Sequence, residues 1–237
     1  MMDWDTFFKL HDELPREGPG TEEDVLWAAE LAGTPAFARI LDAGSGPGGD
    51  IEALLKVAPE GRVLAVDMHQ GFVDAVAKRF EGDKRVTAKA GSMMHEHGPF
   101  DLIWSAGAVY FVGVAEALNT WSKALAPGGA VAFSEPCLFR PAPDEAVNTL
   151  FEGHLPDNEA GIRAKVEAAG YEVLGTRRVS DAGWEAYYQP QEDRIEMLRA
   201  EDDDALDAVL DEAEAEIAVW RKHREDFGYL LCVARPR

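Results

Sequence analysis

Residues 40–50 read Ile40-Leu41-Asp42-Ala43-Gly44-Ser45-Gly46-Pro47-Gly48-Gly49-Asp50, and this stretch decides the fold. An apolar strand ends in an acidic residue, a glycine-rich turn follows, and a helix begins. Glycine lets the backbone take positive φ and come close to a ligand, and the start of a helix offers unpaired N–H groups. The stretch therefore predicts the cradle of a nucleotide-like cofactor, and the rest of the chain has to identify which one.

Outward from this loop, apolar strands alternate with amphipathic helices. The expected strands are 38–41, 62–67, 85–90, 100–105, 130–134, 171–179 and 227–234. Strands joined by helices run parallel, so the pattern predicts an α/β fold with a doubly wound, mostly parallel sheet. Ligands of such sheets bind beyond the carboxyl ends of the strands, which is where the glycine loop lies.

Two segments outside this alternation are expected to flank the ligand. In residues 1–35, two short helices surround Leu14-Pro15-Arg16-Glu17-Gly18-Pro19-Gly20, a segment that cannot be regular structure. It is either a linker or part of an N-terminal helical lid, whose Arg16 meets an anion beyond the first strand. In the remaining domain, residues 36–237, a helical insertion at about 181–226 is too long for a turn, and we expect it to cap the pocket.

The composition limits the class of protein. The 237 residues carry a formal net charge of −21, which argues against nucleic acid as a partner because phosphates require clustered Lys and Arg. Much of the acid lies between Glu192 and Asp226, where we expect a solvated helical face. No membrane helix or signal peptide is visible, and the two cysteines lie far apart. We therefore expect a cytoplasmic protein without a disulfide framework or a metal site.

The glycine loop alone fits both a nicotinamide site and an adenosylmethionine site. Asp67, at the end of the second strand, does not separate them, because an acid there accepts ribose hydroxyls in both. Three other features favour adenosylmethionine. Asp42 precedes the loop by two residues, where a carboxylate can hold the loop and an ammonium group. Residues 91–93 form a turn placed to flank an adenine, and Leu125-Ala126-Pro127-Gly128-Gly129 with a closing hairpin indicates a different sheet.

In this order, the motifs look like those of the class I S-adenosylmethionine-dependent methyltransferases. The residues that carry the resemblance are Leu41-Asp42-Ala43-Gly44-Ser45-Gly46-Pro47-Gly48, Val66-Asp67, Asp101-Leu102-Ile103-Trp104-Ser105 and Leu125-Ala126-Pro127-Gly128-Gly129. The resemblance implies a Rossmann-like, seven-stranded sheet with only the last strand antiparallel, and S-adenosylmethionine as the cofactor. Residues 14–20 and Gly107-Ala108-Val109-Tyr110 further resemble a bacterial, small-molecule-type branch.

By position, the resemblance also implies a cofactor site. The methionine end lies against Asp42 and the glycine loop, Asp67 takes the ribose hydroxyls, and Met68 faces the adenine. Ser92 departs from many relatives, which have an acid there to accept from the adenine amino group, although a hydroxyl can accept as well. The full set of expected cofactor contacts is Arg16, Asp42, Gly44, Ser45, Gly46, Asp67, Met68, Ser92, Met93 and Ser105.

Methyl transfer from a sulfonium is an in-line displacement, so the protein mainly aligns the nucleophile and excludes water. The loop after the fourth strand, Ser105-Ala106-Gly107-Ala108, lacks the Asn/Asp-Pro-Pro-aromatic motif that methylates base amino groups, and it lacks carboxylates for magnesium. Tyr110 and Glu135 follow the fourth and fifth strands and are the expected catalytic residues. The other residues expected around the acceptor are Trp184, Tyr187, Tyr188, His11, Arg16 and His154.

These features together predict a methyltransferase that acts on a small molecule. Two alternatives stay open at this point. An NAD(P)-dependent oxidoreductase would need hydride-transfer residues such as a Tyr-x-x-x-Lys motif, which residues 110–114 do not supply. A non-catalytic module would bind adenosylmethionine and methylate nothing.

Overall fold

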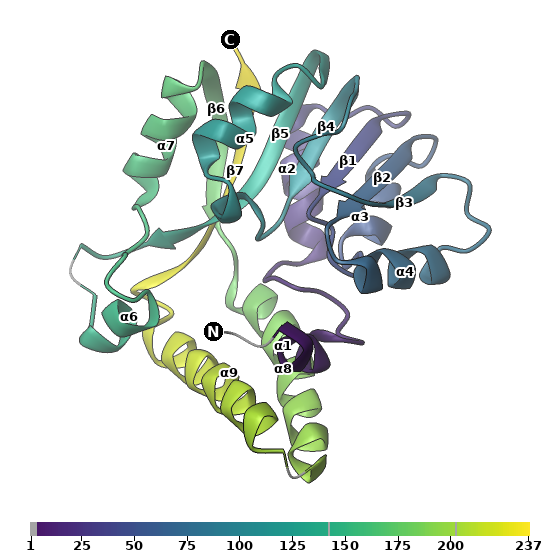
Figure 1. The fold of residues 1–237 in the computed structure, drawn as a ribbon. Helices are drawn as coiled ribbons and strands as arrows, with labels where there is room; N and C mark the ends of the chain where they lie inside the picture. Colours follow the sequence, from purple (N-terminus) through teal and green to yellow (C-terminus); the bar gives the residue numbers. More distant parts are fainter. Residues whose placement is uncertain (1–3, 142, 202) are drawn as a thin grey trace.

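A computed structural model describes residues 4–141, 143–201 and 203–237, with a seven-stranded sheet in the order β3-β2-β1-β4-β5-β7-β6 (Figure 1). Neighbouring strands are parallel except at β7, which is antiparallel to both β5 and β6. The expected α/β fold, with only the last strand antiparallel, is therefore confirmed. The strands are β1 (Arg39–Ala43), β2 (Arg62–Asp67), β3 (Val86–Ala90), β4 (Phe100–Ser105), β5 (Leu125–Leu138), β6 (Tyr171–Arg178) and β7 (Phe227–Pro236).

Helices cover both faces of the sheet. The helices of these two layers are α2 (Glu22–Ala32), α3 (Ile51–Val57), α4 (Gln70–Arg79), α5 (Val114–Trp121) and α7 (Glu159–Ala168). The first three share one hydrophobic core with the sheet, and α5 and α7 share the other. Successive strand residues point to opposite cores, so Ile40 packs with α2 to α4 and Leu41 packs with α5 and α7. Burial on both sides explains why the strands read as continuous apolar runs.

A second group of helices extends from one end of the sheet (Figure 1). Its members are α1 (Trp4–His11), α6 (Glu145–Leu150), α8 (Asp181–Leu198) and α9 (Asp204–His223). α1 packs against both α8 and α9, and α6 packs against α9. The expected insertion at 181–226 is thus a pair of long helices, whereas α6 was not expected. In the described ranges, no helix is both long enough and apolar enough to cross a membrane.

β5 is longer than the expected strand 130–134 at both ends. Its second half pairs with β7, for example Glu135 with Leu230, so the strand continues as far as this partner does. At its start, Pro127-Gly128-Gly129 lies inside the strand, next to a register shift against β4. The extension holds Glu135 in fixed strand geometry at the end of the sheet.

The start of α2 shows how the N-terminal segment is fixed to the sheet. Thr21 and Asp24 form a capping box, in which the Thr21 backbone N–H donates to Asp24 Oδ2 at 2.8 Å. The other oxygen of Asp24 accepts from the guanidinium of Arg177 on β6. Because Asp24 is buried, its charge needs both sets of donors. The helix therefore begins at a point that is held by β6.

Candidate functional site

The glycine loop forms a narrow turn beyond β1 and β2. The backbone N–H groups of Gly44 and Ser45 donate to the carbonyl of Val66, which holds the loop against β2. Gly44 has φ +74°, and a Cβ built on it would lie 2.5 Å from the Cβ of Ala108. Only glycine meets both conditions, so the backbone itself forms the wall of the cradle.

Asp67 connects this loop to the end of β2. Its Oδ2 accepts from the backbone N–H of Gly46 at 2.9 Å, and its Oδ1 accepts from that of His69, also at 2.9 Å. Each carboxylate oxygen keeps a further lone pair, so both can still accept from ribose hydroxyls. The neighbouring Met68 is 82% exposed, as expected of a side chain available to an adenine.

Asp42 is the buried acid of the cradle. It is 3% exposed, and its Oδ2 has no hydrogen-bond partner among the described residues. Burial, followed by the carboxylates of Asp50 and Asp67, raises the pKa of Asp42 well above its ordinary value, while Arg16 opposes this shift. A buried carboxylate without a partner suits a cationic donor. The residues present therefore fit the ammonium end of S-adenosylmethionine.

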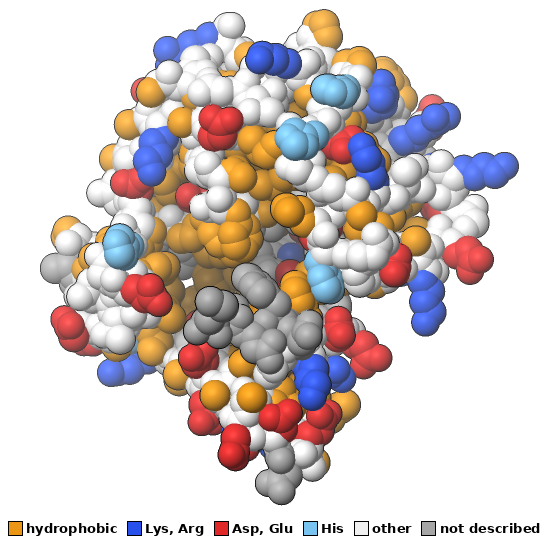
Figure 2. Space-filling view, viewed as in Figure 1, with side chains coloured by type: hydrophobic (Ala, Val, Ile, Leu, Met, Phe, Trp, Pro, Cys, Tyr) orange, Lys and Arg blue, Asp and Glu red, His pale blue; other side chains and the backbone are white. Residues whose placement is uncertain are grey.

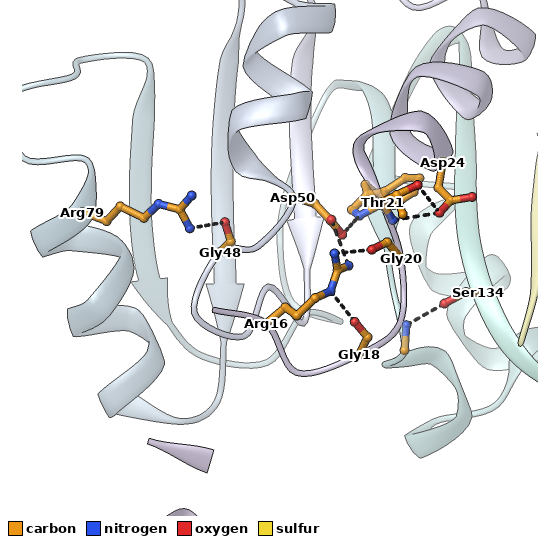
Figure 3. A network of polar contacts seen from close by, with 11 residues as sticks. Arg16, Gly18, Gly20, Thr21, Asp24, Gly48, Asp50, Arg79 and Ser134 are labelled. Carbon is orange, nitrogen blue, oxygen red and sulfur yellow. Dashed lines mark hydrogen bonds and ion pairs between the residues drawn. The ribbon is translucent and has the colours of Figure 1, made fainter. Parts of the chain in front are cut away.

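Arg16 lies across the mouth of the cradle (Figure 3). Its Nη2 donates to Oδ1 of Asp50 at 3.1 Å, and its other nitrogens donate to the carbonyls of Gly18 and Gly20. The cavity between residues 16–18 and the glycine loop measures only about 20 Å³, room for about one water and far too little for a nucleotide-like cofactor. The segment thus covers the cradle, and a cofactor can enter only when it moves.

Three serine side chains that were expected to contact the cofactor form hydrogen bonds within the protein. The hydroxyl of Ser105 is buried and donates to the carbonyl of Ala43 at 2.8 Å, which joins the ends of β4 and β1. The hydroxyl of Ser45 contacts the Gly46 carbonyl, and that of Ser92 accepts from a backbone N–H two residues on. Ser105 therefore shapes the cradle from inside the sheet. The expected Met93 lies beside Gly44, with Sδ 3.5 Å from a Cβ built there.

A much larger cavity of about 830 Å³ adjoins the cradle. It lies between the end of the sheet and helices α1, α8 and α9, and Figure 2 shows the hollow with hydrophobic side chains inside it. Its volume is that of a typical small-molecule site. The sequence-predicted residues that line it are His11, Tyr110, Glu135, His154, Trp184, Tyr187 and Tyr188. Arg16 is not among them, because it lines the cradle.

The sequence did not indicate several other lining residues of the cavity. These are, among others, Glu17, Gln191, Glu216 and Tyr229. Glu216 corrects the expectation that the acidic stretch is only a solvated face. Outer acids of α9 do pair with Arg199, but the Glu216 carboxylate accepts from the Tyr188 hydroxyl at 2.9 Å. Solvent reaches Glu216, yet the protein atoms around its carboxylate raise its pKa.

The two expected catalytic residues have perturbed pKa values. Burial raises the pKa of Glu135 to about 7, and its Oε2 lacks a hydrogen-bond partner in the described part of the chain. Tyr110 is 43% exposed, yet the protein atoms around its hydroxyl, and then the charge of Glu216, raise its pKa to about 12. Glu135 can therefore hold or release a proton near neutral pH, whereas Tyr110 remains protonated.

Trp184 belongs to the core and to the cavity wall at once. It is buried and stacks on Trp220, with ring centroids 5.1 Å apart, and it meets the ring of Tyr229 edge-on. Tyr188 packs against the same two tryptophans. The aromatic cluster thus fixes α8 and α9 to β7 while its inner surface lines the cavity.

The comparisons with known proteins agree with this geometry. Residues 40–129 match the family model described as "Methyltransferase domain". Over 138 residues, the chain is 32% identical to trans-aconitate 2-methyltransferase of Methylobacterium nodulans. The aligned region covers 57% of this chain and 51% of that protein. Over 130 residues it is 32% identical to malonyl-[acyl-carrier protein] O-methyltransferase of Enterobacter lignolyticus, covering 54% and 48%. The chain thus spans about half the length of these curated relatives.

The likeness to a solved structure extends over the whole chain. A SAM-dependent methyltransferase from Geobacter sulfurreducens, solved with S-adenosyl-L-homocysteine, superposes with a TM-score of 0.83 at 23% identity and covers 100% of both chains. At this identity the likeness establishes the fold. Residues 40–129 therefore match the model of a methyltransferase domain, and the chain as a whole has a Rossmann-like fold like that of the solved SAM-dependent methyltransferase.

Proposed function

We propose that this protein is an S-adenosylmethionine-dependent methyltransferase that acts on a small-molecule acceptor. The observation that carries the proposal is the position of Glu17, which borders both the cradle beside Asp42 and the cavity of about 830 Å³. A cofactor in the cradle and an acceptor in the cavity would be neighbours, as methyl transfer requires. The family match over residues 40–129 and the similar structure with S-adenosylhomocysteine support the proposal.

In this function, Asp42 and Asp67 hold the two polar ends of the cofactor, which supplies an electrophilic methyl group when bound. The cavity residues hold the acceptor and exclude water. A thioether leaves without needing a proton, so the site requires no general acid. With its pKa near 12, Tyr110 donates a hydrogen bond and packs against the acceptor, and Glu135, with a pKa near 7, is suited to take a proton.

Calorimetric titration with S-adenosylhomocysteine tests cofactor binding. We expect the wild type to bind, and Asp67→Ala to bind at least about tenfold more weakly, since about 1.4 kcal/mol of lost hydrogen bonding corresponds to that factor. Asp74→Ala is the matched control, because this aspartate is exposed on α4, where it accepts a hydrogen bond from Gln70. A wild-type protein that does not bind S-adenosylhomocysteine would contradict the proposal.

An acceptor screen with labelled S-adenosylmethionine separates the enzyme from a binding module. The two curated relatives are named for a tricarboxylate and for malonyl-carrier protein, so carboxylates belong in the screen together with amines, phenols and thiols. Transfer of label to a small molecule is the expected result. Binding of S-adenosylhomocysteine without transfer to any of these classes would favour the module.

A further inference from the structure

The larger cavity carries an excess of negative charge. Its carboxylates are those of Glu17, Glu135, Asp157, Glu212 and Glu216. Among the described residues that line it, Lys165 is the only lysine or arginine, and its Nζ lies 2.5 Å from Oδ2 of Asp157. Lys165 also acts electrostatically on Glu135, and Nδ1 of His11 lies 2.5 Å from Oε2 of Glu17, yet the five carboxylates still outnumber the basic side chains that line the cavity. An anionic acceptor would meet repulsion there, and a cationic one would be attracted.

The carboxylates surround aromatic rings. Glu216, Glu135 and Glu17 all act electrostatically on the hydroxyl of Tyr110, and each of them raises its pKa. Glu216 and Glu135 act in the same way on Tyr229. Aromatic faces attract cations, most strongly where the site is partly desolvated. The aromatic rings and the carboxylates therefore both favour a cationic ligand group in this part of the cavity.

Polar atoms without partners point to a ligand as well. In the described part of the chain, Oε2 of Glu135 and Oε1 of Glu17 are buried acceptors that no donor reaches. Gln191 is 4% exposed and lines the cavity; its side chain acts on the hydroxyl of Tyr187, but its Nε2 has no hydrogen-bond partner of good geometry among the described residues. Leaving such groups unsatisfied is costly. They call for a ligand that brings N–H donors for the glutamates and an oxygen for Gln191.

We infer that the methyl acceptor is a small organic amine that also carries an oxygen, with its nitrogen bound by Glu135 against the ring of Tyr110. The inference rests on the proposed methyltransferase function and adds the class of substrate. It differs from the carboxylates for which the matched relatives are named.

Proton transfer to Glu135 completes the chemistry. A bound ammonium, R–NH₃⁺, has no free lone pair, so it first gives one proton to the Glu135 carboxylate and becomes R–NH₂. The nitrogen lone pair then forms the new N–C bond, while the electron pair of the broken C–S bond stays on the sulfur. The product is R–NH₂⁺–CH₃, and Glu135 returns its proton to solvent. The pKa of Glu135 near 7 allows both transfers at neutral pH.

Three phenols of matched size test the inference in protein saturated with S-adenosylhomocysteine. Tyramine carries an ammonium, tyrosol carries a hydroxyl at the same place, and 3-(4-hydroxyphenyl)propionate carries a carboxylate. In calorimetric titrations we expect tyramine to bind at least about tenfold more tightly than tyrosol, and the carboxylate to bind most weakly. Equal or tighter binding of tyrosol or of the carboxylate would overturn the inference, and so would the absence of tyramine binding.

Substitutions of cavity glutamates test where the amine nitrogen of the acceptor binds. Glu135→Gln and Glu216→Gln should each weaken tyramine binding, Glu135→Gln by about tenfold, and leave tyrosol within about twofold. Glu196→Gln is the control, because Glu196 is exposed on α8 and does not line the cavity. Unchanged tyramine affinity in both cavity variants would also overturn the inference. If the wild-type protein does not bind S-adenosylhomocysteine, the proposed function itself is wrong.

Discussion

The indole Nε1 of Trp104 donates a hydrogen bond to Oδ2 of Asp50 at 2.9 Å, beneath the segment that covers the cradle. The other oxygen of Asp50 accepts from Arg16. Asp50 is buried, so these two donors satisfy a charge that has little contact with water. A residue inside β4 thus helps to hold Arg16, and with it the N-terminal segment, over the glycine loop.

Replacement of Trp104 by Phe should destabilise the protein by about 1–3 kcal/mol, because Oδ2 of Asp50 loses its donor while remaining buried. Urea unfolding measures the change. Trp27→Phe is the control, since Trp27 interacts through its ring with Arg177 and a phenyl ring preserves that contact. Equal destabilisation by both variants would mean that the hydrogen bond to Asp50 contributes nothing.

Asp42→Asn should stabilise the protein while it weakens binding of the cofactor. The raised pKa of Asp42 means that proton uptake favours the folded state, and that this stabilisation is lost as the pH rises through the folded-state pKa. Asparagine imitates the protonated form, so at pH 8 the variant should melt at a higher temperature than the wild type. The same change should weaken S-adenosylhomocysteine binding by about tenfold or more. Asp74→Asn should alter neither quantity, and a lower melting temperature for Asp42→Asn would refute the explanation.

Glu135→Gln should change stability in a pH-dependent way. The pKa of Glu135 rises from 4.5 to about 7 on folding, so its stabilising contribution is complete below pH 4.5 and is lost as the pH approaches 7. Above that value the variant should be more stable than the wild type by no more than about 3 kcal/mol, and below it the two should converge. Urea unfolding between pH 4.5 and 8.5 gives the curve. Glu196→Gln, the same substitution on the exposed surface of α8, is the control.

Gly44→Ala should destabilise the protein more than Gly82→Ala. Both glycines have positive φ, so both changes should cost about 1–2 kcal/mol in backbone strain. Only at Gly44 does the added Cβ meet another atom, at 2.5 Å from Ala108, whereas nothing lies within 4 Å at Gly82. Overpacking of this kind adds about 1–3 kcal/mol. Thermal melting of both variants tests the difference, and equal losses would mean that the loop can shift to admit a methyl group.

The sequence predicts those parts of the site whose chemistry is local. Asp42 lies two residues before the glycine loop, and Asp67 follows after one helix and one strand. The alternation of apolar residues places all three at one end of the sheet. The glycines of the loop permit positive φ, and Gly44 has φ +74° in the structure. Fold class and cradle position follow from such short-range patterns.

The walls of the larger cavity depend on contacts between distant segments. Glu216 lies within an acidic helix, and its sequence neighbourhood gives no sign that α1 and α8 turn this side of α9 towards the cavity. Tyr229 has no distinguishing sequence signal as an aromatic residue of a strand; its place at the cavity depends on the position of β7 between β5 and β6. β5 likewise continues to Leu138 because residues 131–138 pair with β7. Strand pairing and helix packing between distant segments therefore determine the cavity walls, and local sequence patterns do not predict them.

The position of Glu17 between the two cavities has a kinetic consequence. The segment that must move to admit the cofactor also forms a wall of the larger cavity, so acceptor binding before the cofactor would meet an unfinished surface. We expect a compulsory order of addition, with the cofactor first, and S-adenosylhomocysteine as a competitive inhibitor against the cofactor alone. By thermodynamic reciprocity, a bound acceptor should raise the affinity for the cofactor by the same factor by which the bound cofactor raises the affinity for the acceptor.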